Sequence, residues 1–243
     1  DVERSRGLGD VYKRQVLTDI SFKAKKGQTI AVIGSTGSGK STLINLIPRY
    51  YDVTKGSVKV DGVDVRDMTQ KELRDKLGYV PQKGVLFSGT IDSNIRYGKP
   101  EITDAQVKEA AEVAQATEFI DTKPEKYESP VSQGGTNVSG GQKQRLSIAR
   151  AIAKDPEIFI FDDSFSALDF KTDSQLRKAL KEYTKDATTV IVAQRISTIL
   201  GADQIIVLDD GHMAGIGTHK ELMANCEVYQ QIARSQLSEE ELA

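Results

Sequence analysis

The sequence is poor in the residues that build metal centres and covalent cross-links. It has one cysteine, Cys226, and two histidines in 243 residues, so an internal disulfide is excluded and no cluster predicts a zinc site. The formal charge of −2 comes without a basic stripe, so nucleic acid is not expected as a partner. No apolar run approaches the roughly 20 residues of a membrane helix. The remaining composition, 38% hydrophobic and 28% charged, fits an α/β domain with an inserted lobe.

Apolar runs alternate with helical patterns along the chain. A strand is expected from Val16, and Ile30–Ile33 forms the continuous apolar run typical of a buried parallel strand. Three similar runs follow Pro156, "EIFIFDD", "TTVIVAQR" and "QIIVLDDG", with a helix expected over 173–184 between the first two. Strands separated by helices of this length predict right-handed βαβ crossovers on one sheet. The last 25 or so residues indicate a pair of helices with a polar end.

Two further segments interrupt this alternation. "GSVKVDGVDVRD" has period-two alternation around Asp61-Gly62 and predicts a hairpin. Residues 103–120 predict a helix that begins with a capping box of Thr103 and Gln106. Together with the helix expected in "GGQKQRLSIARAIAKD", this segment would form a helical subdomain over about 84–154. The whole domain is expected to span 16–237, followed by a polar tail, 238–243.

A glycine-rich sequence motif marks the first candidate site. "GSTGSGKST" fits G-x-x-x-x-G-K-[ST] and lies between an apolar strand and an apolar-striped helix. Its glycines allow backbone N–H groups to turn inward around an anion, and the helix dipole adds to this. Lys40 can reach β- and γ-phosphates and the Ser41 hydroxyl can ligate magnesium. The residues assigned to nucleotide binding are Gly34, Ser35, Thr36, Gly37, Ser38, Gly39, Lys40, Ser41 and Thr42. The alternative is a glycine-rich turn with a solvated lysine.

An acidic strand end supplies the second half of this site. In "FIFDDSFSALD", Asp162 ends an apolar strand and would hold magnesium through a water molecule, while Asp163 follows where a general base would lie. Alone, the two aspartates could be a polar strand end or a helix cap. Together with the glycine-rich phrase they predict a P-loop NTPase of RecA-like α/β fold, with a parallel sheet core, a small antiparallel β subdomain and an inserted α-helical subdomain.

The order of further motifs resembles one family of nucleotide hydrolases. "NVSGGQKQRLSIARAI" resembles the signature of ATP-binding-cassette (ABC) proteins, and it follows Gln82 in "YVPQ" and precedes "SALD" and "VAQRIS". The resemblance covers Val16–Leu237. "LFSGTIDSNIRYG" and "GHMAGIGTHKELM" look like the exporter branch, in which the ATPase follows its membrane domain. The resemblance implies an ATPase with ATP and Mg²⁺ as cofactors, a fused or adjacent transmembrane domain, and a place on the cytoplasmic face of the cell membrane.

The resemblance also assigns roles to individual residues. Two such domains face head to tail, so Ser139, Gly140, Gly141 and Gln142 would bind the ATP held by the P-loop of the partner, at a helix N-terminus. Without a partner, this phrase is only a helix cap. Gln82 would contact magnesium and the attacking water. Asp169 would link the two sites across the dimer, or else cap the next helix.

Two departures from the family pattern stand next to the expected γ-phosphate. Most hydrolysing members carry Glu where this chain has Asp163, and His where it has Gln194. The shorter carboxylate reaches about 1.5 Å less far, and a base must come within hydrogen-bond distance of the water. Both changes together resemble the degenerate half of heterodimeric exporters, whose partner keeps Glu and His. The alternative is a homodimer in which Asp163 is a weaker base.

Other classes and the N-terminus stay open. A soluble ABC protein acting on ribosomes or DNA would need a second cassette or a basic arm. The exporter-like motifs after Gln82 argue against a separately encoded importer subunit. Residues 1–15 are expected to be non-native, because "DVYKRQ" matches one reading frame of a transposon-end adaptor sequence. An adenine-stacking aromatic would then have been lost with the authentic N-terminus. The alternative is a genuine first strand in which Tyr12 stacks on the nucleotide.

Overall fold

A six-stranded sheet forms the centre of the computed structural model, which describes residues 16–237. The strand order is β10-β9-β1-β8-β7-β4. Five strands are parallel: β1 (Thr29–Gly34), β4 (Leu77–Val80), β7 (Ile158–Asp162), β8 (Thr188–Val192) and β9 (Gln204–Asp209). The sixth, β10 (His212–Gly217), runs antiparallel at one edge. The predicted parallel α/β core is therefore confirmed.

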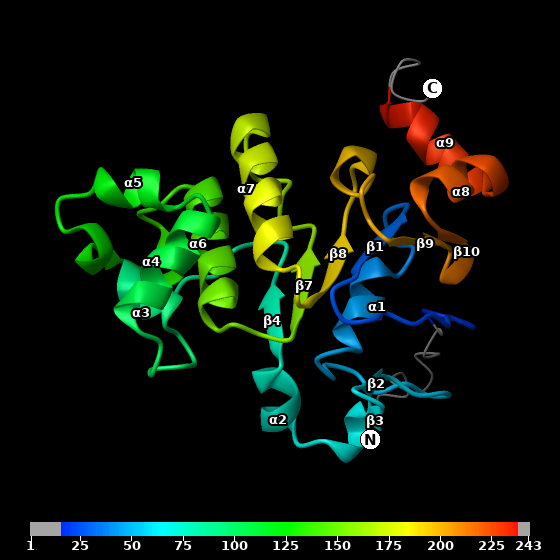
Figure 1. The fold of residues 1–243 in the computed structure, drawn as a ribbon, viewed down its shortest axis with the longest axis horizontal. Coiled ribbons are helices and arrows are strands. Elements are labelled where there is room, and N and C mark those ends of the chain that lie inside the picture. Colours follow the sequence, from blue (N-terminus) through cyan, green and yellow to red (C-terminus); the bar gives the residue numbers. More distant parts are fainter. Residues whose placement is uncertain (1–15, 238–243) are drawn as a thin grey trace, which may run out of the picture.

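The central strand β1 shows why its apolar run is continuous. Ile30 and Val32 pack into one buried cluster and Ala31 and Ile33 into another, on opposite faces of the sheet. The first cluster contains Leu43 and Ile44 of α1 (Lys40–Asn45). The second contains residues of the helix pair α8 (His219–Asn225) and α9 (Glu227–Gln236), which confirms the helices predicted at the end of the chain (Figure 1).

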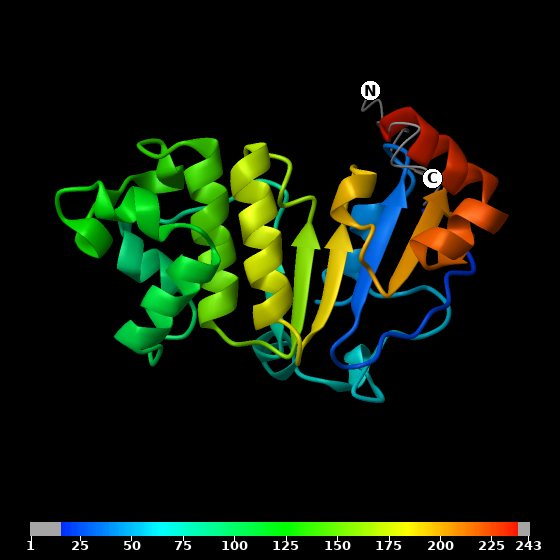
Figure 2. The same cartoon turned by 45° about the horizontal axis from the view of Figure 1, so that its top comes forward.

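Most of the helices between β4 and β7 gather on one side of the sheet (Figures 1 and 2). They are α3 (Ile91–Ile95), α4 (Asp104–Val113), α5 (Thr117–Asp121) and α6 (Gly140–Ala153), with the short elements β5 (Gly89–Thr90), β6 (Pro130–Val131), η2 (Lys126–Glu128) and η3 (Gln133–Gly135). Their apolar side chains share one buried cluster with Leu176 and Leu180 of α7 (Phe170–Tyr183). The range 84–154 for a separate subdomain stays a prediction.

Two predicted helices have different bounds in the structure. The single helix expected over 103–120 is wrong, because the chain breaks at Gln115, whose φ of 55° is left-handed, and α5 then begins. Its capping box of Thr103 and Gln106 is confirmed. Helix α7 begins at Phe170 and not at 173, because Asp169 caps it by accepting a hydrogen bond from the Thr172 N–H.

The predicted hairpin is present and is short. It pairs β2 (Lys59–Val60) with β3 (Val63–Asp64) through Asp61 and Gly62, whose φ angles are 51° and 81°, as a two-residue type I′ turn requires. The strand expected from Val16 is not formed within the described residues 16–28. Among residues 16–237, β2 and β3 pair with each other and with no other strand. Thr18 instead donates one backbone hydrogen bond to Gly211 O. Next come η1 (Val65–Asp67) and α2 (Gln70–Asp75).

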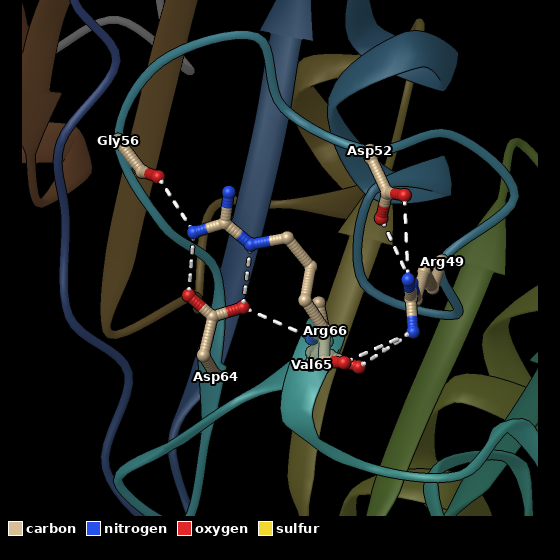
Figure 3. A network of polar contacts seen from close by, with 6 residues as sticks. All are labelled: Arg49, Asp52, Gly56, Asp64, Val65 and Arg66. Carbon is tan, nitrogen blue, oxygen red and sulfur yellow. Dashed lines mark hydrogen bonds and ion pairs between the residues drawn. The ribbon is translucent and has the colours of Figure 1, made fainter.

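Two arginines fasten the loop after α1 to this hairpin (Figure 3). Arg49 donates from Nε to Asp52 Oδ1 over 2.8 Å and from Nη1 to the carbonyl of Arg66 over 3.3 Å. Arg66 pairs with Asp64 through two bonds of 3.0 and 2.8 Å and donates to Gly56 O over 3.1 Å. The Arg66 guanidinium lowers the pKa of Asp64 to about 2. The loop and the hairpin region are thus joined by hydrogen bonds from the two guanidinium groups to backbone carbonyls, while each guanidinium is paired with an aspartate of its own segment.

Candidate functional site

The glycine-rich phrase occupies the turn from β1 into α1, as predicted. Gly37 and Gly39 adopt φ angles of 84° and 100°, which residues with a Cβ rarely adopt. Gly39 is the N-cap of α1, and no side chain caps the helix. The first N–H groups of α1 are therefore open to an anion. The outer turn closes through a bond of 3.2 Å from Ser38 N to Ser35 O.

Lys40 lies across this loop. Its Nζ donates to Gly34 O over 2.8 Å and to Ser35 O over 2.7 Å. Burial lowers the pKa of the ammonium, and the nearby carboxylates of Asp163 and Asp162 oppose that shift. The loop carbonyls thus hold a positive charge at the loop, close enough to Asp162 and Asp163 to interact with both carboxylates.

Ser41 and Asp162 provide oxygen ligands side by side. Ser41 Oγ donates to Asp162 Oδ1 over 3.1 Å, although the two residues are 121 positions apart. Burial raises the pKa of Asp162, since only 9% of the residue is exposed. Hydroxyl and carboxylate oxygens are ligands that Mg²⁺ accepts, usually together with water and substrate phosphates. This donor set fits the magnesium ion predicted here.

A tyrosine outside the sequence motifs also contacts Asp162. Tyr79 Oη lies 3.4 Å from Asp162 Oδ2 and 3.0 Å from Asn45 Oδ1. Burial raises the pKa of Tyr79, with the Asp162 carboxylate acting in the same direction, so its hydroxyl stays a donor. Its position three residues before Gln82 on the apolar strand "LGYV" was the only signal in the sequence.

Asp163 is held by both predicted glutamines. Its Oδ2 accepts hydrogen bonds from Gln194 Nε2 over 2.7 Å and from Gln82 Nε2 over 3.1 Å. Its φ is 47°, in the left-handed region, and its N–H donates to Val192 O over 3.0 Å. A cavity of about 440 Å³ opens beside Asp163 and Gln194 and reaches Gln236 of α9. The structure therefore brings together three side chains from the ends of β4, β7 and β8.

The signature lies elsewhere. Ser139 caps α6 in a capping box with Gln142, with bonds of 3.2 and 3.1 Å. Ser139 and Gly140 are exposed, and a Cβ on Gly140 would meet no atom within 4 Å. Helix α6 and α1 lie on opposite sides of β4 and β7 (Figures 1 and 2). The chain does not place its signature against its own P-loop.

These features define a class of protein. A parallel sheet carries a phosphate-binding loop at the end of one strand and two aspartates at the end of another, at the edge where α/β sheets bind ligands. The open N–H groups, Lys40, Ser41 and Asp162 fit a nucleoside triphosphate with Mg²⁺. The molecule is a P-loop nucleotide-binding domain.

The comparisons with known proteins name the family. Residues 17–166 match the model of the family described as ABC transporter. An uncharacterised ABC transporter ATP-binding protein of Mycobacterium tuberculosis is 50% identical over 224 residues, 91% of this chain and 38% of that protein. A protein of Staphylococcus aureus named as a multidrug export ATP-binding/permease protein is 44% identical over 240 residues, 95% of this chain and 42% of that protein.

A solved structure agrees in fold. A bacterial Atm1-family ABC exporter with ATP bound superposes with a TM-score of 0.89 at 39% identity, covering 94% of this chain and 41% of that one. The chain therefore belongs to the ABC transporter family and is an ATP-binding domain, an ATPase that uses ATP with Mg²⁺. It spans about two fifths of the length of these relatives. No helix among residues 16–237 is long and apolar enough to cross a membrane.

Proposed function

We propose that this chain supplies ATP binding and hydrolysis to an exporter, on the cytoplasmic face of a cell membrane. Two relatives support this, one named as a multidrug export ATP-binding/permease protein and one an ABC exporter. The proposed partners are a fused or adjacent transmembrane domain and a second ABC ATPase domain. An importer subunit and a soluble ABC ATPase are the alternatives. Six membrane spans encoded in frame upstream would support the exporter, and membrane spans found neither upstream in frame nor in an adjacent gene would contradict it.

The P-loop side of the proposed mechanism follows from the contacts at the loop. Lys40 and the N–H groups of Gly34–Thr42 bind the β- and γ-phosphates. Ser41 and Asp162, together with Gln82, would hold a Mg²⁺ ion, which would neutralise charge on these phosphates. Asp163 is the group that accepts the proton of the attacking water, and Gln194 donates a hydrogen bond to the γ-phosphate.

The pairing of Asp163 with Gln194 carries the second part of the proposal, a degenerate site. Two amide groups donate to the same oxygen, Oδ2, and a carboxylate oxygen has about two lone-pair positions. Only Oδ1 is left to take a proton from water, on a side chain about 1.5 Å shorter than glutamate. Gln194 carries no proton that titrates, unlike the histidine that the family resemblance implies for most hydrolysing members. This site therefore binds ATP and hydrolyses it slowly.

The intact signature supports the complementary half of the proposal. Ser139, Gly140 and Gly141 begin α6, whose N-terminus is exposed at Ser139 and Gly140 and lies apart from the P-loop of the same chain (Figures 1 and 2). In a head-to-tail dimer, this end of α6 completes the nucleotide site of a partner that carries Glu and His. ATP turnover by the transporter then depends more on this chain's signature than on its own base.

Two substitutions in the complete transporter test this asymmetry. Asp163→Asn should change steady-state ATPase activity by less than about twofold. Ser139→Ala should lower it at least about 100-fold, because it removes a donor to developing phosphate charge. Thr103→Ala is the matched control, since it removes an equivalent capping box at α4 and costs about 1 kcal/mol of stability. In a homodimer, Asp163→Asn would itself lower activity about 100- to 10,000-fold, which would refute the degenerate-site proposal.

A further inference from the structure

We infer that Gln236, at the end of α9, is a positioning residue that holds the backbone around Gln194 and so sets how this site retains ATP. Gln236 Nε2 donates to Gln194 O over 2.8 Å, and Gln236 Oε1 accepts from Ile196 N over 2.8 Å. One side-chain amide thus binds a carbonyl and an N–H of the same loop. The inference rests on the proposed function, because it takes Gln194 to contact the γ-phosphate.

The loop depends on this contact because one of its sides is open. Gln194 and Arg195 are exposed, and the cavity of about 440 Å³ lies against the loop. Before the loop, Ala193 N is bonded to Val32 O in the sheet over 3.1 Å. The loop itself is then joined to α9 through Gln236.

A second helix holds the far end of the same loop. Arg177 of α7 donates to Ser197 O over 3.0 Å, while its other nitrogens pair with the buried Asp173 over 3.1 and 3.0 Å. Ile196 is fully buried and packs in one cluster with Tyr229, Ala233 and Leu237 of the C-terminal region. Arg177 fixes residue 197 and Gln236 fixes residues 194 and 196. Of these two side chains, Gln236 is the one that bonds Gln194, whose side chain reaches Asp163.

The orientation of Gln194 follows from these bonds. Its Nε2 donates to Asp163 Oδ2 over 2.7 Å while its own carbonyl accepts from Gln236. Rotation of the peptide at Gln194 would break the bond from Gln236 and would move Gln194 Nε2 away from Asp163. Loss of Gln236 should therefore widen the range of Gln194 positions and weaken contact with the γ-phosphate, without removing any group that touches ATP.

The first experiment tests the contact without nucleotide. Hydrogen exchange of residues 193–199 is measured in the full 243-residue chain. Gln236→Ala should speed exchange of the Ile196 amide at least tenfold, because its acceptor is lost. Gln236→Glu should keep that amide protected, because a carboxylate still accepts, but it cannot donate to Gln194 O. Unchanged exchange in Gln236→Ala would overturn the inference, whatever the fate of the degenerate-site proposal.

The second experiment tests the effect on ATP. Release of radiolabelled ATP with Mg²⁺ from the complete transporter is followed after dilution. Gln236→Ala and Gln236→Glu should both speed release about tenfold, which corresponds to about 1.4 kcal/mol. Gln230→Ala is the matched control, since Gln230 lies on the same helix but donates to Met223 O over 2.9 Å. Equal release from all four proteins would overturn the positioning role. If both Gln236 variants release ATP rapidly while Asp163→Asn strongly lowers ATPase activity, the degenerate-site proposal is refuted and the positioning role of Gln236 is not.

Discussion

Restoring a longer base and a histidine should raise ATP turnover at this chain's own site. The perturbation is Asp163→Glu together with Gln194→His. Asp163 Oδ2 is bonded by Gln194 and Gln82 over 2.7 and 3.1 Å, so the carboxylate is held beside them. One further C–C bond extends it by about 1.5 Å, and a displacement of about 1 Å is worth on the order of 100-fold in rate. The expected gain is about 100-fold.

The assay must separate this site from the partner's. Ser139→Ala on this chain disables the signature that completes the partner's site, so the remaining steady-state ATP hydrolysis reports on the P-loop of this chain. The gain is measured between the transporter with Ser139→Ala alone and the same protein with the two restoring changes. Adding Lys40→Ala should abolish the gain, because the ammonium over the loop is lost.

One result would refute the reasoning. If ATP still binds and the restored protein hydrolyses it no faster than the protein with Ser139→Ala alone, this chain does not carry a separate slow site that is limited by the reach of Asp163. A homodimer would give that result, because Ser139→Ala would then disable both sites.

Two further outcomes concern stability. The folded pKa of Asp64 is about 2 and its ordinary value is 3.8, so its ion pair stabilises the fold above about pH 4 and this stabilisation is lost as the pH falls towards 2. In urea unfolding at several pH values, Arg66→Ala should remove that part of the pH dependence. An unchanged profile would contradict the assignment. Leu146→Ala, at a fully buried position of α6, should cost about 2–5 kcal/mol of unfolding free energy in urea. Leu146→Met should cost less than about 1.5 kcal/mol, and equal losses would show that packing volume is not the cause.

Local chemistry explains which elements could be predicted from the sequence. The P-loop turn needs glycine at left-handed positions, and the hairpin needs the Asp61-Gly62 pair, so both are visible in a short window. The break at Gln115 is not visible, because glutamine suits a helix interior and nothing nearby demands its φ of 55°. The strand expected from Val16 failed for a different reason, since pairing depends on partners far along the chain.

The candidate site divides in the same way. Lys40, Ser41 and Asp162 belong to phrases with a known mechanism, and the structure brings them together. Tyr79 and Gln236 contact that site only because the fold brings together residues 83 and 40 to 42 positions apart. Neither residue stands in a pattern that chemistry alone would single out. Their roles follow from tertiary contacts alone.

The backbone conformation at Asp163 restricts which side chains are stable at this position, independently of the catalytic requirement for a base. Its φ of 47° suits glycine, asparagine and aspartate, whereas other side chains pay on the order of 1–2 kcal/mol there. A library randomised at position 163 would therefore be enriched differently by two sorting schemes. Survival of heating would favour the short residues, and ATP turnover would favour glutamate. A lineage freed from the need for rapid hydrolysis at this site would gain thermal tolerance by shortening its base.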